Sequence, residues 1–195
     1  MSDTPPVVLV VEDESDVAET YRRWLRSSYD VRVAPDGAAA LGELDEMVDV
    51  VLLDRMMPEM SGEAVLREIR DRGIDCRVAM VSAVDPDFDI VEMGFDAYVT
   101  KPPERDELLE TIDRLLDRAE VDEDLQEYYS LVARQSAIEA EKTEAELEAS
   151  TEYAELVERV ERSREAVDEE LGDMSTDTDF VGAVREIMDE EGQTE

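Results

Sequence analysis

The chain has 195 residues, of which 43% are apolar, and this length allows one full domain and a smaller second part. Its 55 acidic residues outnumber the 19 basic ones, which leaves a net charge of −36, and it contains no histidine. No apolar run approaches the ~20 residues of a membrane-spanning helix, and the N-terminus shows no secretory signal, so we expect neither membrane insertion nor export.

Strand and helix signals alternate over the first 119 residues. Short apolar runs predict five buried strands, at residues 7–11, 31–34, 48–53, 76–82 and 96–99. Amphipathic segments after these runs predict helices at residues 15–27, 36–46, 61–72, 86–93 and 104–118. This order is typical of an α/β domain with a parallel sheet and helices on both faces. We therefore assign residues 1–119 to one such domain.

The composition changes near residue 120, where proline and strand-like runs disappear. Residues 123–148 predict one helix and residues 151–171 a second. In the second, residues at alternating spacings of three and four are typical of a coiled coil: Tyr153, Leu156, Val160, Ser163 and Val167. A third helix is expected around Phe180–Met188, and the tail after Asp189 is expected to be disordered. We therefore expect residues 120–195 to form an all-α segment. Its apolar stripes are too narrow to stabilise each helix alone, so the helices must pack on one another, on a second copy or on a partner.

Four of the predicted strands run into polar side chains: Glu12 and Asp13, Asp54, Ser82, and Lys101. Because the carboxyl ends of parallel strands share one edge of a sheet, where ligands bind, we expect these residues to form one site. Three carboxylates in a chain without histidine favour a hard cation such as Mg²⁺ over zinc. A lysine and a serine beside them suit phosphoryl transfer onto a carboxylate, with the cation and the ammonium stabilising the charge.

These residues and their neighbours resemble the receiver domain of two-component response regulators. The matching elements are Glu12-Asp13, Asp54 followed by Met57-Pro58 and Gly62, Ser82-Ala83, and Tyr98 with Lys101-Pro102. They agree with the family in order, spacing and flanking apolar runs over about residues 6–119. The resemblance implies a flavodoxin-like, doubly wound sheet of five parallel strands in the order 2-1-3-4-5.

The resemblance also implies roles for the charged residues. Asp54 would be the phosphoacceptor, and a partner histidine kinase would supply the phosphoryl group. Glu12, Asp13, Asp54 and the backbone carbonyl of Met56 would hold Mg²⁺. Lys101 would pair with Asp54 and then with its phosphoryl group. Such a protein accepts a phosphoryl group and removes it from itself, and is not an enzyme acting on a separate substrate.

Two further residues would read the phosphorylated state. Ser82 would move toward the phosphoryl oxygens, and Tyr98 would change rotamer with it. The peptide bond between Lys101 and Pro102 would be cis. A phosphatase of the haloacid dehalogenase type is a poor alternative, because it needs a second aspartate at the position that Met56 occupies. A degenerate receiver that works without phosphorylation is a further alternative, although no member of the site is missing.

The C-terminal segment is similar to the HalX domain, which follows receivers in haloarchaea and is associated with transcription. The net charge of −20 over residues 120–195 argues against simple DNA binding, because phosphates would be repelled. Its only basic cluster is Arg159, Arg162 and Arg164, of which the first two share a helix face laced with glutamates. The alternatives are a homodimer formed through the apolar stripe, or an adapter that docks a protein partner without touching DNA.

The acidity covers the whole chain, with a net charge of −16 on residues 1–119 as well. Such a coat keeps a protein soluble where molar salt screens repulsion beyond ~3 Å. A single cysteine, Cys76, cannot form an intrachain disulfide, which suits a reducing compartment. We therefore expect a haloarchaeal, cytoplasmic protein.

Overall fold

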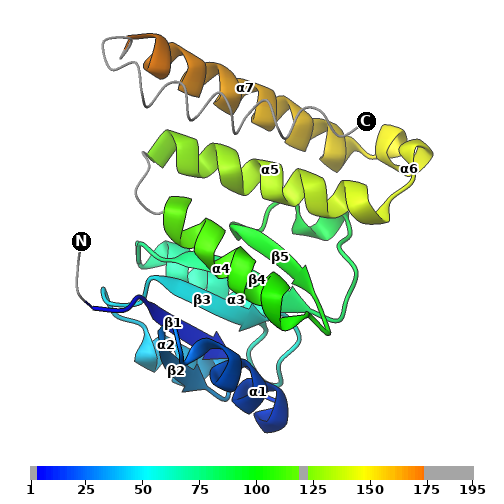
Figure 1. The fold of residues 1–195 in the computed structure, drawn as a ribbon. Coiled ribbons are helices and arrows are strands. Elements are labelled where there is room, and N and C mark those ends of the chain that lie inside the picture. The colour runs from blue at the N-terminus through cyan, green and yellow to red at the C-terminus, as the bar shows by residue number, and fades with distance from the viewer. Residues whose placement is uncertain (1–3, 119–122, 174–195) are drawn as a thin grey trace.

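The computed structural model describes residues 4–118 and 123–173. Its N-terminal part is a sheet of five parallel strands in the order β2-β1-β3-β4-β5, which confirms the expected flavodoxin-like topology (Figure 1). The strands are β1 (Val7–Val11), β2 (Asp30–Ala34), β3 (Val50–Asp54), β4 (Arg77–Ser82) and β5 (Ala97–Thr100). All five lie within two residues of their predicted positions.

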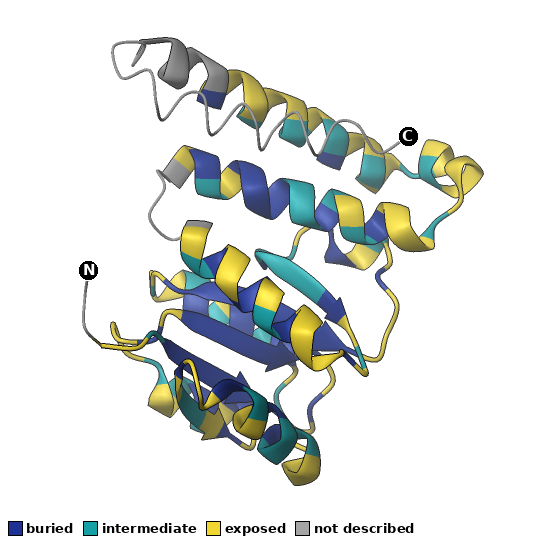
Figure 2. Cartoon of the chain, in the orientation of Figure 1, coloured by how far each residue is buried: buried dark blue, intermediate teal, exposed yellow. Residues whose placement is uncertain are grey.

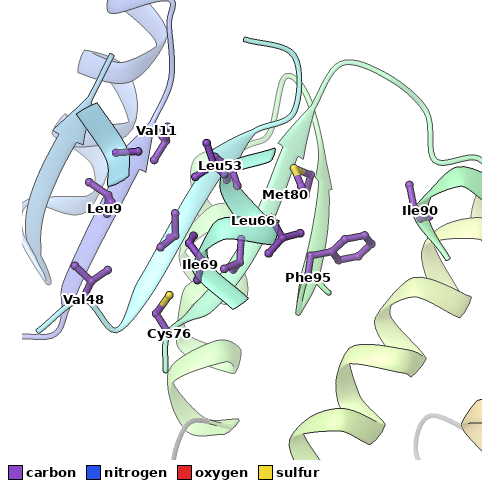
Figure 3. Close-up of a cluster of buried hydrophobic side chains, with 14 of the residues drawn as sticks. Leu9, Val11, Val48, Leu53, Leu66, Ile69, Cys76, Met80, Ile90 and Phe95 are labelled. Carbon is purple, nitrogen blue, oxygen red and sulfur yellow. The ribbon is translucent and has the colours of Figure 1, made fainter. Parts of the chain in front are cut away.

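Helices cover both faces of this sheet. Helices α1 (Ser15–Leu25) and α4 (Arg105–Arg118) pack on one face, and α2 (Gly37–Glu43) and α3 (Gly62–Asp71) pack on the other. Alternate residues of β1 supply the two cores: Val8 and Val10 face α1 and α4, whereas Leu9 and Val11 face α2 and α3 (Figure 3). Burial on both sides explains why the central strands read as continuous apolar runs.

Local side chains set the helix ends that the sequence predicts. The Asp36 carboxylate accepts a hydrogen bond from the backbone N–H of Ala39 at 2.8 Å, and so caps α2. The Ser61 hydroxyl accepts one from the backbone N–H of Ala64 at 3.3 Å, and so caps α3. Gly73, with a φ of 64°, lies just beyond the end of α3, where a left-handed backbone favours glycine.

The helix predicted at residues 86–93 is wrong. Between β4 and β5 the structure has only the single 3₁₀ turn η1 (Phe88–Ile90). In a continuous helix the Val91 carbonyl would accept a hydrogen bond from the N–H four residues later. Here it accepts one from the side chain of Arg134, in a helix of the C-terminal part. Tertiary contacts therefore override the local periodicity of this segment.

The C-terminal part contains helices α5 (Glu123–Glu141), α6 (Glu144–Ala149) and α7 (Thr151–Asp173). The single helix predicted over residues 123–148 is therefore wrong, because a new helix begins after Thr143. The Glu146 carboxylate accepts a hydrogen bond from the Thr143 backbone N–H at 2.9 Å, as in a capping box. The helix predicted at residues 151–171 is confirmed as α7. The third helix and the tail lie outside the described residues.

Helices α5 and α7 run antiparallel and stack against the receiver-like part (Figure 1). Leu131 and Ile138 of α5, with Leu156 of α7, belong to the same buried cluster as Ile90 and Phe95. The core on the α2/α3 side of the sheet thus continues without a break into the helical part.

The apolar stripe of α7 is used within the chain. Leu156 is fully buried, Tyr153 and Val160 pack on the same core, and Val167 packs on α5. Figure 2 shows that much of α5 is buried, whereas α7 is largely exposed. Among the described residues, the exposed large apolar side chains are Val33, Met47, Met56 and Val84, all of which lie before α5. The described stripe therefore offers a second copy no exposed apolar face. Within the same ranges, every helix is too short or too polar to cross a membrane.

Candidate phosphoacceptor and metal site

Parallel pairing brings the predicted polar residues to one edge of the sheet. Val11 pairs with Leu53, so that Glu12 and Asp54 follow on neighbouring strands. Carboxylate oxygens of Glu12, Asp13 and Asp54 lie within 4.8 Å of one another. Glu12 and Asp54 are buried, whereas Asp13 is exposed. The cluster is thus open to solvent on the side of Asp13.

Lys101 holds this cluster together. Its Nζ donates to Oε2 of Glu12 at 2.6 Å and to Oδ2 of Asp54 at 2.8 Å. Burial opposes the charge of this ammonium, but the hydrogen bonds to Asp54 and Glu12 outweigh it and raise the pKa of Lys101. Burial raises the pKa of Glu12, and the hydrogen bond from Lys101 offsets part of that effect.

The backbone after Asp54 folds back tightly over the strand end. The Met56 N–H donates to Oδ1 of Asp54 at 3.0 Å, and the Gly62 N–H donates to the Arg55 carbonyl at 2.9 Å. A Cβ on Gly62 would lie 2.2 Å from the Asp54 carbonyl oxygen, so only glycine fits there. The Met56 side chain is 64% exposed, whereas that of Met57 is buried. Met57 thus fills space in the core, whereas the exposed side chain of Met56 does not.

Ser82 and Tyr98 are linked to each other by hydrogen bonds to Val84. The buried Ser82 hydroxyl accepts a hydrogen bond from the Val84 N–H at 3.1 Å. The Tyr98 hydroxyl donates to the Val84 carbonyl at 2.6 Å. The Ser82 carbonyl in turn accepts from the Lys101 N–H at 2.7 Å. The peptide bond between Lys101 and Pro102 is cis, as the resemblance implied.

The sequence interpretation missed Arg55, which directly follows Asp54. Its side chain is 6% exposed and pairs with Glu63 at 2.9 Å and with Asp89. Burial works against this guanidinium, but hydrogen bonds to Glu63 and Asp89 raise its pKa. The sequence did carry a signal for Arg55: a charged residue that directly follows a buried strand is itself buried in part and needs charged or polar partners.

The donor set fits a divalent cation. Three carboxylates and one ammonium leave the cluster with a formal charge of −2, and all the side-chain ligands are oxygens. Mg²⁺ prefers one or two carboxylates, carbonyl oxygens and water. A backbone carbonyl at Met56 and the solvent beside Asp13 could complete such a shell.

Sequence comparisons identify two families along the chain. Residues 8–113 match the response regulator receiver domain, and residues 117–184 match the HalX domain. A protein of Haloferax volcanii whose name places it among transcriptional regulators is 42% identical over 183 residues, which are 93% of this chain and 31% of that protein. The sensory transduction protein RegX3 of Mycobacterium tuberculosis is 43% identical over 116 residues, or 57% of this chain and 51% of that protein. The chain thus spans about a third to a half of these relatives.

The fold is also found among solved structures. The response regulator TrrA of Thermotoga maritima, in complex with Mg²⁺ and a beryllium fluoride, is 32% identical, with a TM-score of 0.51. The match covers 56% of this chain and 98% of that one. The match to the Haloferax protein agrees with the haloarchaeal origin that the acidic surface suggests.

Proposed function

The chain belongs to the response regulator receiver family, with a HalX domain after the receiver, and from this premise we propose that a histidine kinase phosphorylates Asp54 to switch its helical output part. The observation that carries the proposal is the position of Asp54. It is a buried carboxylate at a strand end, 2.8 Å from an ammonium and within 4.8 Å of two more carboxylates. We place the event in the cytoplasm, where the buried, free thiol of Cys76 stays reduced.

Asp54 acts as the nucleophile in this proposal. One of its carboxylate oxygens bonds to phosphorus while the phosphorus–nitrogen bond to the kinase histidine breaks, and the electron pair stays on the imidazole. Glu12, Asp13, Asp54 and the Met56 carbonyl would hold Mg²⁺, and the ion would neutralise charge on the phosphoryl oxygens. Lys101 leaves its carboxylate partners in part and donates to a phosphoryl oxygen, from a position already fixed by hydrogen bonds.

The phosphoryl group then changes the partner of Ser82. Its hydroxyl accepts from the Val84 N–H in the present state and donates to a phosphoryl oxygen in the phosphorylated one. Because Tyr98 is hydrogen-bonded to the same Val84, movement of Val84 couples the side chain of Ser82 to that of Tyr98. The two states differ in contacts that the phosphoryl group makes, as a population shift requires.

The proposed output is regulation of transcription, in line with the name of the Haloferax relative. A signalling adapter that docks a protein partner is the second candidate. It is favoured by the net charge of −20 on residues 120–195, which repels nucleic acid. A gel shift with genomic fragments at molar salt separates the two, because only the transcriptional function requires retention of DNA.

The phosphoacceptor is tested by intact mass. After incubation with a small-molecule acyl phosphate and Mg²⁺ in molar KCl, the protein should gain about 80 Da, the mass of one phosphoryl group. Asp54→Asn should abolish the gain, whereas the matched control Asp16→Asn, an exposed acid on α1, should keep it. A gain that persists in Asp54→Asn would refute the site assignment.

A further inference from the structure

The helical part meets the receiver along β5 and along the stretch of chain that precedes β5. We call residues 83–96 the β4–β5 link and residues 123–173, which contain α5 to α7, the helical hairpin. The Ser130 hydroxyl of the hairpin donates to the Phe95 carbonyl of the link at 2.7 Å. Lys142 pairs with Asp87 at 3.0 Å, and its Nζ lies 5.5 Å from the centre of the Phe88 ring. These contacts attach the hairpin to the segment that replaces the predicted helix.

Arg134 is the buried centre of this interface. The residue is 5% exposed, and its Nη1 donates to the Val91 carbonyl at 2.9 Å. Its Nε and Nη2 donate to the carbonyl and the hydroxyl of Ser130 at 3.0 and 3.3 Å. Burial lowers the pKa of this guanidinium to about 10. A buried charge held by neutral acceptors costs stability, and in some proteins such a residue specifies one arrangement of the parts that it joins.

The use of basic residues points the same way. The described hairpin has five, and three of them contact the link: Arg134, Lys142 and Arg159, the last at 3.2 Å from Glu92. Lys142 is one of only two lysines in the chain, and the other is Lys101 at the site. In a hairpin dominated by glutamate, the few cations are concentrated against this one segment.

The other side of the link reaches the phosphoacceptor. It begins directly after Ser82, and its second residue, Val84, bonds both Ser82 and Tyr98. Farther along, Asp89 pairs with the buried Arg55, which follows Asp54 in sequence. The link therefore contacts residues that adjoin the site at both of these points and the hairpin at Asp87, Val91 and Phe95. It is a physically continuous connection between the two.

We propose that Arg134, Lys142 and Arg159 clamp the hairpin to the β4–β5 link in the unphosphorylated state, and that phosphorylation of Asp54 loosens this clamp. The inference rests on the proposed function. When Ser82 turns to the phosphoryl group, the Val84 N–H loses its acceptor and the start of the link moves. The carbonyl of Val91 then no longer fits the position of Arg134, and α5 is held less firmly.

Thermodynamic linkage makes the clamp measurable from the site. If phosphorylation weakens the clamp, a weakened clamp must favour the phosphorylated state by the same factor. We use beryllium fluoride with Mg²⁺ as the probe, because the solved structure of TrrA is a complex with these two groups. In full-length protein at molar KCl, Arg134→Gln should bind the probe about fivefold more tightly than the wild type, measured by titration calorimetry.

Hydrogen exchange supplies a readout on the hairpin. In the wild type, the probe should increase amide exchange in α5. In Arg134→Gln, exchange should already be high and should respond little. Lys142→Gln removes a partly exposed ion pair, and it should shift probe affinity and α5 exchange in the same direction as Arg134→Gln. It therefore serves as the second clamp variant if Arg134→Gln does not fold. Arg162→Gln is the matched control, because its side chain bonds the Glu158 carbonyl within α7.

The outcomes separate the two proposals. If the protein binds the probe and takes up the phosphoryl group, but both clamp variants match Arg162→Gln in affinity and exchange, the clamp is refuted and the proposed function stands. If Asp54 takes up no phosphoryl group, both fall. Tighter probe binding in a clamp variant, with a smaller exchange response in α5, supports the clamp.

Discussion

Replacing Lys101 by methionine should destabilise the receiver by about 3 kcal/mol in metal-free buffer. The substitution removes the cation that lies 2.6 Å from a Glu12 oxygen and 2.8 Å from an Asp54 oxygen, and leaves two buried carboxylates facing each other. Loss of one partner from a buried ion pair costs about 3–5 kcal/mol. The lower end applies because the Lys101 side chain keeps 14% exposure and water can reach the freed carboxylates.

The assay is urea unfolding in molar KCl with a chelator, followed by tryptophan fluorescence. Trp24 is the sole tryptophan, and it packs beside Tyr21 against the α1/α4 face of the sheet, so it reports on the receiver core. High salt screens exposed pairs far more than this buried one. The control is Arg23→Met, which breaks an exposed pair with Glu19 and should change stability by less than about 0.5 kcal/mol.

Magnesium provides a second check on the same reasoning. Without Lys101 the cluster carries three carboxylates and no ammonium, so a divalent cation should recover more stability in the variant than in the wild type. A variant that unfolds within about 0.5 kcal/mol of the wild type would refute the electrostatic account of the site. So would a loss of stability that Mg²⁺ leaves unchanged.

Three further predictions follow from the same geometry. Gly62→Ala should lower the free energy of unfolding by about 1–3 kcal/mol and impair phosphorylation, because the new Cβ would lie 2.2 Å from a backbone oxygen. The control Gly42→Ala places its Cβ where nothing lies within 4 Å, so it should cause neither loss. Equal melting temperatures for the two variants would contradict this prediction. Mg²⁺ at ten times its dissociation constant should stabilise the wild type by about 1.4 kcal/mol. Asp13→Asn should lose most of this stabilisation by Mg²⁺, whereas the control Asp16→Asn should retain it. Melting temperatures measured with and without Mg²⁺ test both variants. Burial raises the pKa of Cys76 to about 11, so iodoacetamide at pH 8 should alkylate it only after unfolding, and rapid labelling of the folded protein would disprove the buried placement.

The sheet and the site were accessible from sequence because both depend on local patterns. The central strands β1, β3 and β4 are buried on both faces, so each is a short run of mostly apolar residues, and the polar residue that ends or follows the run marks its carboxyl end. Asp54, Lys101 and the Glu12-Asp13 pair follow such runs, and parallel topology brings them together without further information. Only the structure could show that Lys101 pairs with both Glu12 and Asp54, because several side-chain arrangements are compatible with the same spacing in the sequence.

The helical part was less accessible because its decisive interactions are non-local. The periodicity of residues 86–93 satisfies a helix, but Ile90 and Phe95 pack against α5, whose residues come about 40 positions later. The break at Thr143 had a visible signal, since Thr143 and Glu146 form a capping box. The periodicity did not reveal this break, because apolar residues continue at helical spacing before and after Thr143.

By itself, the sequence determined the receiver fold, the identity of the strand-end residues and the acidity of both parts, because these follow from composition and short-range order. Only the tertiary structure decided that Arg134 is buried and that the α7 stripe is covered by α5 and the receiver core. In sequence, Arg134 stands between Ala133 and Gln135, and a charged residue on a helix is ordinarily exposed. Its burial depends on a surface contributed by residues 83–96, and no local pattern carries the information of which surface a helix will meet.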